Sequence, residues 1–178
     1  GSLTQVVFNI GDESEIKPGI MNEKKKTYEP LLTEITSLGT AAGIVESVKP
    51  GGLVAIGTKL DPSMTRSDSF IGSVIGKPGT LPENSTLLKL EVNLFDSAVG
   101  ATEDIKVQPI ASGELLRLNI GTAPVLGTVK KIKSNNVEIE LRRPACIFEG
   151  GNVAISRRIA ERWRLIGAGI VGWSNLWH

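Results

Sequence analysis

The sequence predicts an all-β protein, and two observations carry that prediction. Apolar and polar residues alternate with a period of two in several stretches, which is the pattern of half-buried strands. Turn signals that contain glycine, proline or asparagine separate these stretches at short intervals. Short strands divided by turns at this density are typical of barrels and sandwiches, so we expect two β-barrel domains.

In the first half of the chain, the clearest signals are turns and one charged segment. Turns are predicted where glycine or proline fixes a bend, at residues 9–11, 18–19, 50–52 and 78–79. The segment 22–26 reads Asn-Glu-Lys-Lys-Lys, and we expect it to form the exposed tip of a hairpin. After the turn at 50–52, Leu53, Val54 and Ile56 predict a buried strand.

Three stretches of the second half alternate clearly enough to name their inward faces. The residues predicted to be buried are Leu88, Leu90, Val92 and Leu94, then Leu116, Leu118 and Ile120, then Val137, Ile139 and Leu141. Further turns are expected at 134–136 and 150–152. The stretch 157–164 is compatible with a helix, but we interpret it as a hairpin with residues 160–162 at its tip.

The segment 79–85 is the best candidate for a domain boundary, because proline, glycine and polar residues interrupt two apolar patterns there. We therefore expect one barrel over residues 1–80 and a second over 81–178. The connection 96–113 is longer than most loops inside a compact domain. It is predicted to be either functional or partly disordered.

Composition limits the chemistry that the chain can perform. The 178 residues include 20 Lys and Arg against 19 Asp and Glu, so any nucleic-acid surface has to be a local patch. A single cysteine, Cys146, excludes an internal disulfide, and in its apolar surroundings we expect a buried structural thiol. The only histidine is His178, which leaves no catalytic triad and no histidine metal site. We expect no metal and no catalytic residue.

The sequence also carries no sign of membrane insertion or secretion. No apolar run approaches the ~18 residues that a membrane helix requires, and the first residues do not resemble a secretory signal. We expect a cytoplasmic protein with no membrane partner.

Two stretches have sequences specific enough to indicate a family. One is Pro-Gly-Gly-Leu-Val-Ala-Ile-Gly-Thr-Lys-Leu-Asp-Pro at 50–62, which runs on through 65–68 to Gly-Lys-Pro-Gly-Thr-Leu-Pro at 76–82. The other is Ser-Arg-Arg at 156–158 with Trp-Arg-Leu-Ile-Gly at 163–167. Together they resemble the gamma subunit of translation initiation factor two, a GTPase relative of elongation factor Tu that carries initiator methionyl-tRNA to the small ribosomal subunit.

This resemblance implies an arrangement of domains. It extends from Gly1 to Ile170, and it corresponds to the two C-terminal β-barrels, which are domains II and III in elongation factor Tu. Residues 1–80 would form domain II, with its first strand missing and an edge left exposed, and residues 81–178 would form domain III. The nucleotide-binding domain, with its GTP and Mg²⁺, would lie outside the chain.

The turn at 50–53 is the first candidate site. Read alone, it is a turn that feeds a buried strand, in which glycine permits close approach of a ligand or another backbone. In the resembled family the matching turn shapes the pocket for the terminal adenosine and the esterified amino acid of tRNA. By that match, the predicted pocket residues are Pro50, Gly51, Gly52 and Leu53.

Two groups of cations are the other candidates. Lys59, Arg66 and Lys77 lie among turn residues of the same region, where they would contact tRNA phosphates, although scattered surface cations are common in soluble proteins. The candidate basic partner surface consists of Arg157, Arg158, Arg162 and Arg164 around Trp163, with Arg142 and Arg143 nearby. Arginine suits phosphate or carboxylate, so both RNA and an acidic protein fit; the alternative is a solvated hairpin.

The sequence departs from the resembled family in two places. The connection 96–113 reads Ser-Ala-Val-Gly at 97–100, where many members have an arginine-rich strand, so contacts made there are not transferred. After Gly167 the chain continues with Ala168 and ends in Trp173-Ser-Asn-Leu-Trp177-His178. We expect either that the last strand is altered or that the terminal residues are foreign to it.

Two functions follow from the resemblance. In the first, the chain helps to bind initiator methionyl-tRNA and docks the alpha subunit, with the beta subunit and the small ribosomal subunit as further partners. In the second, it is only a scaffold for the alpha subunit or an assembly factor. A related elongation or selenocysteine-specific factor is a third possibility. The chain has no Gly-Lys-Ser or Gly-Lys-Thr phosphate loop, so we expect no GTPase activity.

Overall fold

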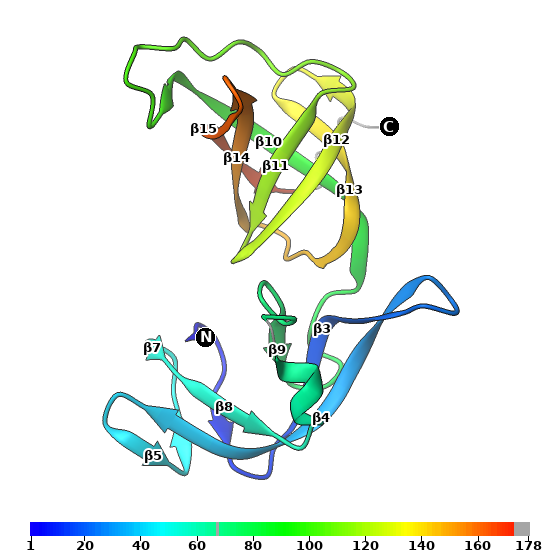
Figure 1. Cartoon of the computed structure of the whole chain (residues 1–178), viewed down its shortest axis with the longest axis vertical. Helices are drawn as coiled ribbons and strands as arrows, with labels where there is room; N and C mark the ends of the chain where they lie inside the picture. The colour runs from blue at the N-terminus through cyan, green and yellow to red at the C-terminus, as the bar shows by residue number, and fades with distance from the viewer. Residues whose placement is uncertain (67, 173–178) are drawn as a thin grey trace. The chain divides into compact units, whose positions relative to one another are not determined.

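The computed structural model describes residues 1–66 and 68–172, and these consist mostly of β-strands (Figure 1). Within the described residues the only helix is a single 3-10 turn, η1 (Pro62–Thr65). The predicted all-β fold is therefore confirmed. No helix in this part of the chain is long and apolar enough to cross a membrane. Ser67, Trp173, Trp177 and His178 lie outside the described residues.

The chain divides into two compact units, unit 1 (Gly1–Leu81) and unit 2 (Pro82–His178). Each unit has a hydrophobic core of its own. The core of unit 1 is built around Phe8, Ile35 and Leu38, which are at most 1% exposed. The core of unit 2 is larger and contains residues from all six of its strands.

Unit 1 contains nine strands in three sheets. Strands β5, β4, β3 and β9 follow one another in the main sheet and β8 also pairs with β4, whereas β1–β7 and β2–β6 form two-stranded ribbons. The strands are β1 (Ser2–Leu3), β2 (Phe8–Asn9), β3 (Glu13–Asn22), β4 (Thr27–Thr40), β5 (Gly43–Val45), β6 (Ser47–Val48), β7 (Gly52–Leu53), β8 (Ala55–Thr58) and β9 (Val74–Gly76).

The long hairpin of β3 and β4 confirms the predicted charged tip. Asn22 pairs with Thr27, and residues 23–26 form the loop between them. The Asn22 side-chain oxygen accepts hydrogen bonds from the backbone N–H groups of Lys24 (3.1 Å) and Lys25 (3.2 Å). Lys26 adopts a positive φ of 52° and closes the loop. Asparagine thus organises the turn through its side chain.

A buried charged group fastens the end of unit 1 to β3. Lys17 is only 4% exposed, and its Nζ donates to the carbonyl of Leu81 (3.3 Å). Nearby, the Glu15 carboxylate accepts a hydrogen bond from the N–H of Gly79 (3.1 Å) and lies 3.8 Å from Lys17 Nζ. The segment 79–81 is not part of a strand, and the side chains of Lys17 and Glu15 attach it to β3.

Unit 2 is a closed barrel in which every neighbouring pair of strands is antiparallel. The order around the ring is β10-β13-β12-β11-β14-β15. The strands are β10 (Asn84–Val99), β11 (Leu115–Ile120), β12 (Ala123–Lys133), β13 (Asn136–Cys146), β14 (Asn152–Ile159) and β15 (Arg162–Val171). Closure removes exposed strand edges.

The predicted inward faces of unit 2 are confirmed. Leu88 and Leu90 of β10, Leu116 and Leu118 of β11 and Ile139 of β13 are all at most 1% exposed and lie in one core. Leu94 is partly buried against that core. Cys146 ends β13 and is buried, as expected for a structural thiol.

In unit 2 the predicted hairpin is confirmed, but its turn and the connection before β11 are both shorter than predicted. Residues 157–164 form the predicted hairpin, but its turn is Ala160 and Glu161 alone, with positive φ values of 48° and 64°. Arg162 already belongs to β15. The long connection does not begin at Asp96, because β10 continues to Val99.

Candidate functional site

The turn at 50–53 projects its side chains into solvent while the neighbouring strand is anchored. Leu53 is 74% exposed, and the next residue, Val54, is 8% exposed and belongs to the core. Strand β1 pairs with β7 along the turn, with Ser2 opposite Leu53. Gly51 N–H donates to the carbonyl of Leu3 (3.1 Å). The turn is thus an exposed loop on a fixed base.

Glycine at positions 51 and 52 leaves room at this turn. Gly51 has a φ of +118°, which L-residues rarely adopt. No atom lies within 4 Å of a Cβ built on Gly51 or Gly52, so the space above the turn is open. Pro50 is also exposed. All four predicted pocket residues therefore share one accessible surface.

The three predicted phosphate-binding cations differ in how they are held. Lys59 follows β8, and its Nζ lies 2.6 Å from a carboxylate oxygen of Glu34. Arg66 directly follows η1 and is exposed, and Lys77 directly follows β9 and is also exposed. Among the described residues neither Arg66 nor Lys77 has an ion-pair partner. The charge of Lys59 is balanced, whereas those of Arg66 and Lys77 are not.

Asp61 caps η1, the short helix that precedes Arg66. Its carboxylate caps η1 by accepting a hydrogen bond from the backbone N–H of Ser63 (2.8 Å), and Pro62 occupies the first helical position. Hydrogen bonding from the Ser63 side chain, followed by that from its backbone, lowers the pKa of Asp61. Asp61 therefore acts as the N-terminal cap of η1.

The arginine hairpin of unit 2 splits into two groups. Arg157 and Arg164 lie directly opposite each other on β14 and β15 and are partly buried. Arg164 Nη1 donates to the carbonyl of Gly100. The side chains of Arg158 and Arg162 are exposed and make no hydrogen bond or ion pair within the described residues. Only the second pair is available to a partner.

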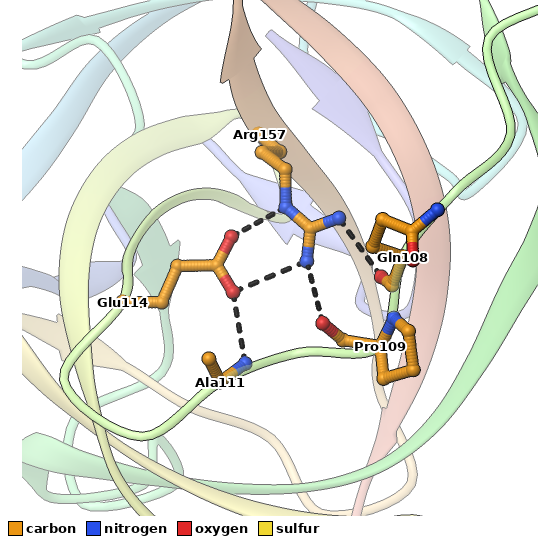
Figure 2. Close-up of polar contacts among 5 residues, drawn as sticks. All are labelled: Gln108, Pro109, Ala111, Glu114 and Arg157. Atoms are coloured by element: carbon orange, nitrogen blue, oxygen red, sulfur yellow. Dashed lines mark hydrogen bonds and ion pairs between the residues drawn. The ribbon is translucent and has the colours of Figure 1, made fainter.

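Arg157 holds the long connection between β10 and β11. Figure 2 shows its guanidinium paired with the carboxylate of Glu114 and turned toward two backbone carbonyls. Nη1 donates to Gln108 O (2.8 Å), and Nη2 donates to Pro109 O (3.2 Å) and to Glu114 (3.1 Å). Glu114 also accepts from the N–H of Ala111 (3.0 Å). Arg157 was predicted to be part of a partner surface, but its donors are engaged inside the unit.

Comparisons with known proteins show which family the sequence resembles. The sequence model of the family described as "Initiation factor eIF2 gamma, C terminal" matches residues 86–171. A protein of Aeropyrum pernix named "Translation initiation factor 2 subunit gamma" is 48% identical over 174 residues, which cover 96% of this chain. Proteins of the same name from Archaeoglobus fulgidus and Pyrococcus horikoshii are each 47% identical, again over 96% of this chain. The chain belongs to the translation initiation factor 2 gamma family.

The chain spans less than half the length of these gamma subunits. The matches cover 42% of the Aeropyrum pernix protein and 40% of the Archaeoglobus fulgidus protein. The part matched by the C-terminal family model begins in β10 and ends at Val171, the last residue of β15. The closed barrel is thus the C-terminal domain of the gamma family.

The described residues do not fit a GTP and Mg²⁺ site. The 178 residues contain no Gly-Lys-Ser or Gly-Lys-Thr sequence, which a phosphate loop requires. In the described part of this gamma-family chain, no group of three or more His, Cys, Asp or Glu residues could hold a metal ion. No step of nucleotide chemistry can be derived from these residues.

Sequence reasoning missed the role of Glu114. The signal was present, because Glu114 has the same strand parity as the core residues Leu116 and Leu118 and is therefore directed toward the barrel interior. An inward carboxylate requires a partner, and Arg157 shares the parity of the buried Ile155 on the adjacent strand. Which arginine would supply the partner depended on the register between β11 and β14, which the sequence does not specify.

Proposed function

We propose that this chain contributes to binding initiator methionyl-tRNA and docks the alpha subunit within a gamma subunit of initiation factor 2. The similar proteins are named as gamma subunits, which implies assembly with other subunits. We propose no GTPase activity for the chain itself. GTP and Mg²⁺ would be bound by another part of a whole gamma subunit.

The exposed turn at 50–53 is the observation that carries the tRNA proposal. Its backbone is open at Gly51 and Gly52, so a ribose or base can approach without meeting a Cβ atom. The side chain of Leu53, 74% exposed, offers an apolar contact to the methionyl group. We propose that the turn forms one wall of a pocket for the terminal adenosine and its amino acid.

The cations of unit 1 would add contacts to the phosphates near the acceptor end. Arg66 and Lys77 have no ion-pair partner among the described residues, so a phosphate would meet their full charge. Lys59 would have to share its charge with Glu34, which lies 2.6 Å away. We therefore propose that Arg66 and Lys77 contribute more than Lys59.

For docking of the alpha subunit, we propose the surface of the β3–β4 hairpin. Met21 is 50% exposed and Leu32 is 70% exposed, although both are apolar. Exposed apolar side chains on one element are typical of protein interfaces.

The beta subunit, the small ribosomal subunit and an assembly factor stay predicted partners, and the expected location is the cytoplasm.

A second candidate is a scaffold that binds the alpha subunit without binding RNA. The net charge of +1 favours this alternative, because it provides no long-range attraction for nucleic acid. The two candidates differ in whether the 50–53 turn matters for tRNA.

A protection assay separates the two candidates. In the complete gamma subunit that contains this chain, we would replace Leu53 by Ser and measure how strongly the protein slows hydrolysis of the methionyl ester. We expect protection to fall about tenfold, because an apolar contact of about 1.4 kcal/mol is lost. Ile132→Ser is the control, since Ile132 is exposed on unit 2. Equal protection by both variants would refute the tRNA role of the turn.

A further inference from the structure

The outer wall of the barrel carries a row of residues that the proposed function does not use. Arg117 on β11 lies opposite Leu126 on β12 and opposite Ser156 on β14. On β13, Arg142 directly follows Leu141, the partner of Gly127, and so lies beside Leu126. We call Arg142, Leu126, Arg117 and Ser156, on four successive strands, the outer row.

The side chains of the outer row point away from the core. Arg117 lies between Leu116 and Leu118, both 0% exposed, so alternation directs it outward. Likewise, Leu126 lies between the buried residues Val125 and Gly127. Arg142 is exposed, and Leu126 is half-buried. The row therefore presents a leucine between two arginines.

The two arginines of the row have no partner within their unit. In residues 82–172 the side chains of Arg117 and Arg142 make no hydrogen bond or ion pair, and the Nε of Arg117 is a buried donor without an acceptor. The carboxylate nearest to Arg142 on the outward face of β13 is Glu140. It is already paired with Lys130 at 2.6 Å. Arg158, two residues beyond Ser156, adds a third cation whose side chain has no partner among the described residues.

Three other arginines in unit 2 do have partners within it. Arg143 donates to the carbonyl of Pro124 (2.9 Å), Arg157 pairs with Glu114, and Arg164 donates to Gly100. Those three arginines have structural roles that account for their presence. Arg117 and Arg142 have none. The Nε of Arg117, like that of Arg164, is a buried donor without an acceptor, which is costly.

The spacing of the row fits one class of partner. Neighbouring strands are about 4.8 Å apart, so the backbones of Arg142 and Arg117 are separated by about 10 Å, with Leu126 midway. Residues i and i+7 of an α-helix lie about 10.5 Å apart on one face, and residue i+3 or i+4 falls between them. A helix lying across the strands could therefore place a carboxylate on each arginine and an apolar side chain on Leu126.

We propose that the outer row binds an acidic amphipathic helix of a partner protein, a role that goes beyond the proposed function. A protein is favoured over RNA for two reasons. The row contains aliphatic rather than aromatic side chains, so it has no surface on which bases could stack. Unit 2 has twelve Lys and Arg against ten Asp and Glu, a weak field for a phosphate backbone.

The test uses a synthetic helical peptide with Glu at positions i and i+7 and Leu at i+3 and i+4. Its binding to the 178-residue chain would be measured by fluorescence anisotropy and mapped by backbone NMR shifts. We expect micromolar affinity, shifts centred on residues 117, 126 and 142, and affinity at least tenfold weaker for the double variant Arg117→Gln with Arg142→Gln. The matched control, Lys24→Gln with Lys26→Gln on unit 1, should bind as the original chain does.

Several results would overturn the proposal. These are a peptide in which Gln replaces Glu binding equally well, shifts that fall elsewhere, or no saturable binding at millimolar peptide. A duplex RNA that binds the row more tightly than the peptide, and loses that affinity in the double variant, would assign the row to RNA instead. Arg142→Glu, at an exposed position, repeats the comparison if the double variant does not fold.

Discussion

Arg157 and Glu114 form an ion pair whose side chains are only 16% and 19% exposed, and together they hold the connection between β10 and β11. Arg157 lies on β14 and Glu114 directly precedes β11, and Figure 2 shows the two side chains paired. Through it, the backbone at Gln108, Pro109 and Ala111 is fixed by side chains rather than by strand pairing. Arg157 thus satisfies two carbonyl groups of the connection.

Removing the charge of Glu114 should loosen this connection. In Glu114→Gln, Arg157 would stay partly buried without a counter-charge. We expect the free energy of unfolding to fall by about 2 kcal/mol. We also expect faster hydrogen exchange at Ala111, whose N–H donates to Glu114. Chemical denaturation with exchange measured by NMR checks both effects.

The exposed neighbour provides the control for this variant. Arg158→Gln should change the free energy of unfolding by less than about 0.5 kcal/mol, because Arg158 has no partner among the described residues. Equal effects of Glu114→Gln and Arg158→Gln would show that the ion pair does not hold the connection.

Two glycines with similar backbone angles should respond differently to alanine. Gly19 and Gly11 have φ values of +88° and +91°, so both variants are strained by about 1–2 kcal/mol. At Gly19, however, a Cβ would lie 1.8 Å from the carbonyl oxygen of Glu29, whereas nothing lies within 4 Å at Gly11. We expect Gly19→Ala to unfold unit 1 or melt far lower. Calorimetric melting of both variants tests this, and similar melting temperatures would contradict it.

The cap of η1 should depend on pH in one direction. Because hydrogen bonds from Ser63 lower the pKa of Asp61 in the folded chain, the cap contributes stability above the ordinary value of about 3.9. That contribution is lost as the pH falls through the lowered pKa. Carboxyl NMR titration should give a pKa for Asp61 below the ordinary value, and Ser63→Ala should raise it. An unchanged pKa in Ser63→Ala would exclude this cause.

The cations near the turn should contribute unequally to tRNA binding. In the complete gamma subunit, Arg66→Gln and Lys77→Gln should each weaken binding. Each should also reduce the slope of the logarithm of the binding constant against the logarithm of the salt concentration by about 1, the value for one phosphate contact. Lys59→Gln should have a smaller effect, because Glu34 already balances its charge. Filter binding over a range of salt concentrations measures these slopes. A larger effect at Lys59 than at Arg66 or Lys77 would contradict the proposed arrangement.

Strand positions could be predicted from the sequence because alternation reports burial directly. Leu116 and Leu118 are fully buried on β11, and the hairpin at 157–164 was recognised from its turn residues. The end of β10 was placed too early, since Asp96 and Ser97 are poor strand formers in isolation. They are held there by pairing of Ser97 with Lys106 and by the long-range pairing of Val99 with Leu165 on β15, which the alternation pattern does not reveal.

The candidate site was predictable only in part. Glycine and proline at 50–52 indicated a turn, and the structure shows it exposed. The division of the arginines could not be foreseen, because it depends on which strands are neighbours. Arg157 and Arg158 are adjacent in sequence, yet one is bound to Glu114 and the other is exposed.

The central claim is that this chain docks the alpha subunit of initiation factor 2, and calorimetric titration with the C-terminal domain of that subunit tests it most directly. We predict saturable binding at moderate salt, which weakens at least tenfold when Met21 and Leu32 are both replaced by Ser. Ile132→Ser, on unit 2, should bind as the original chain does. The absence of heat and of co-elution with the alpha-subunit domain would contradict the account.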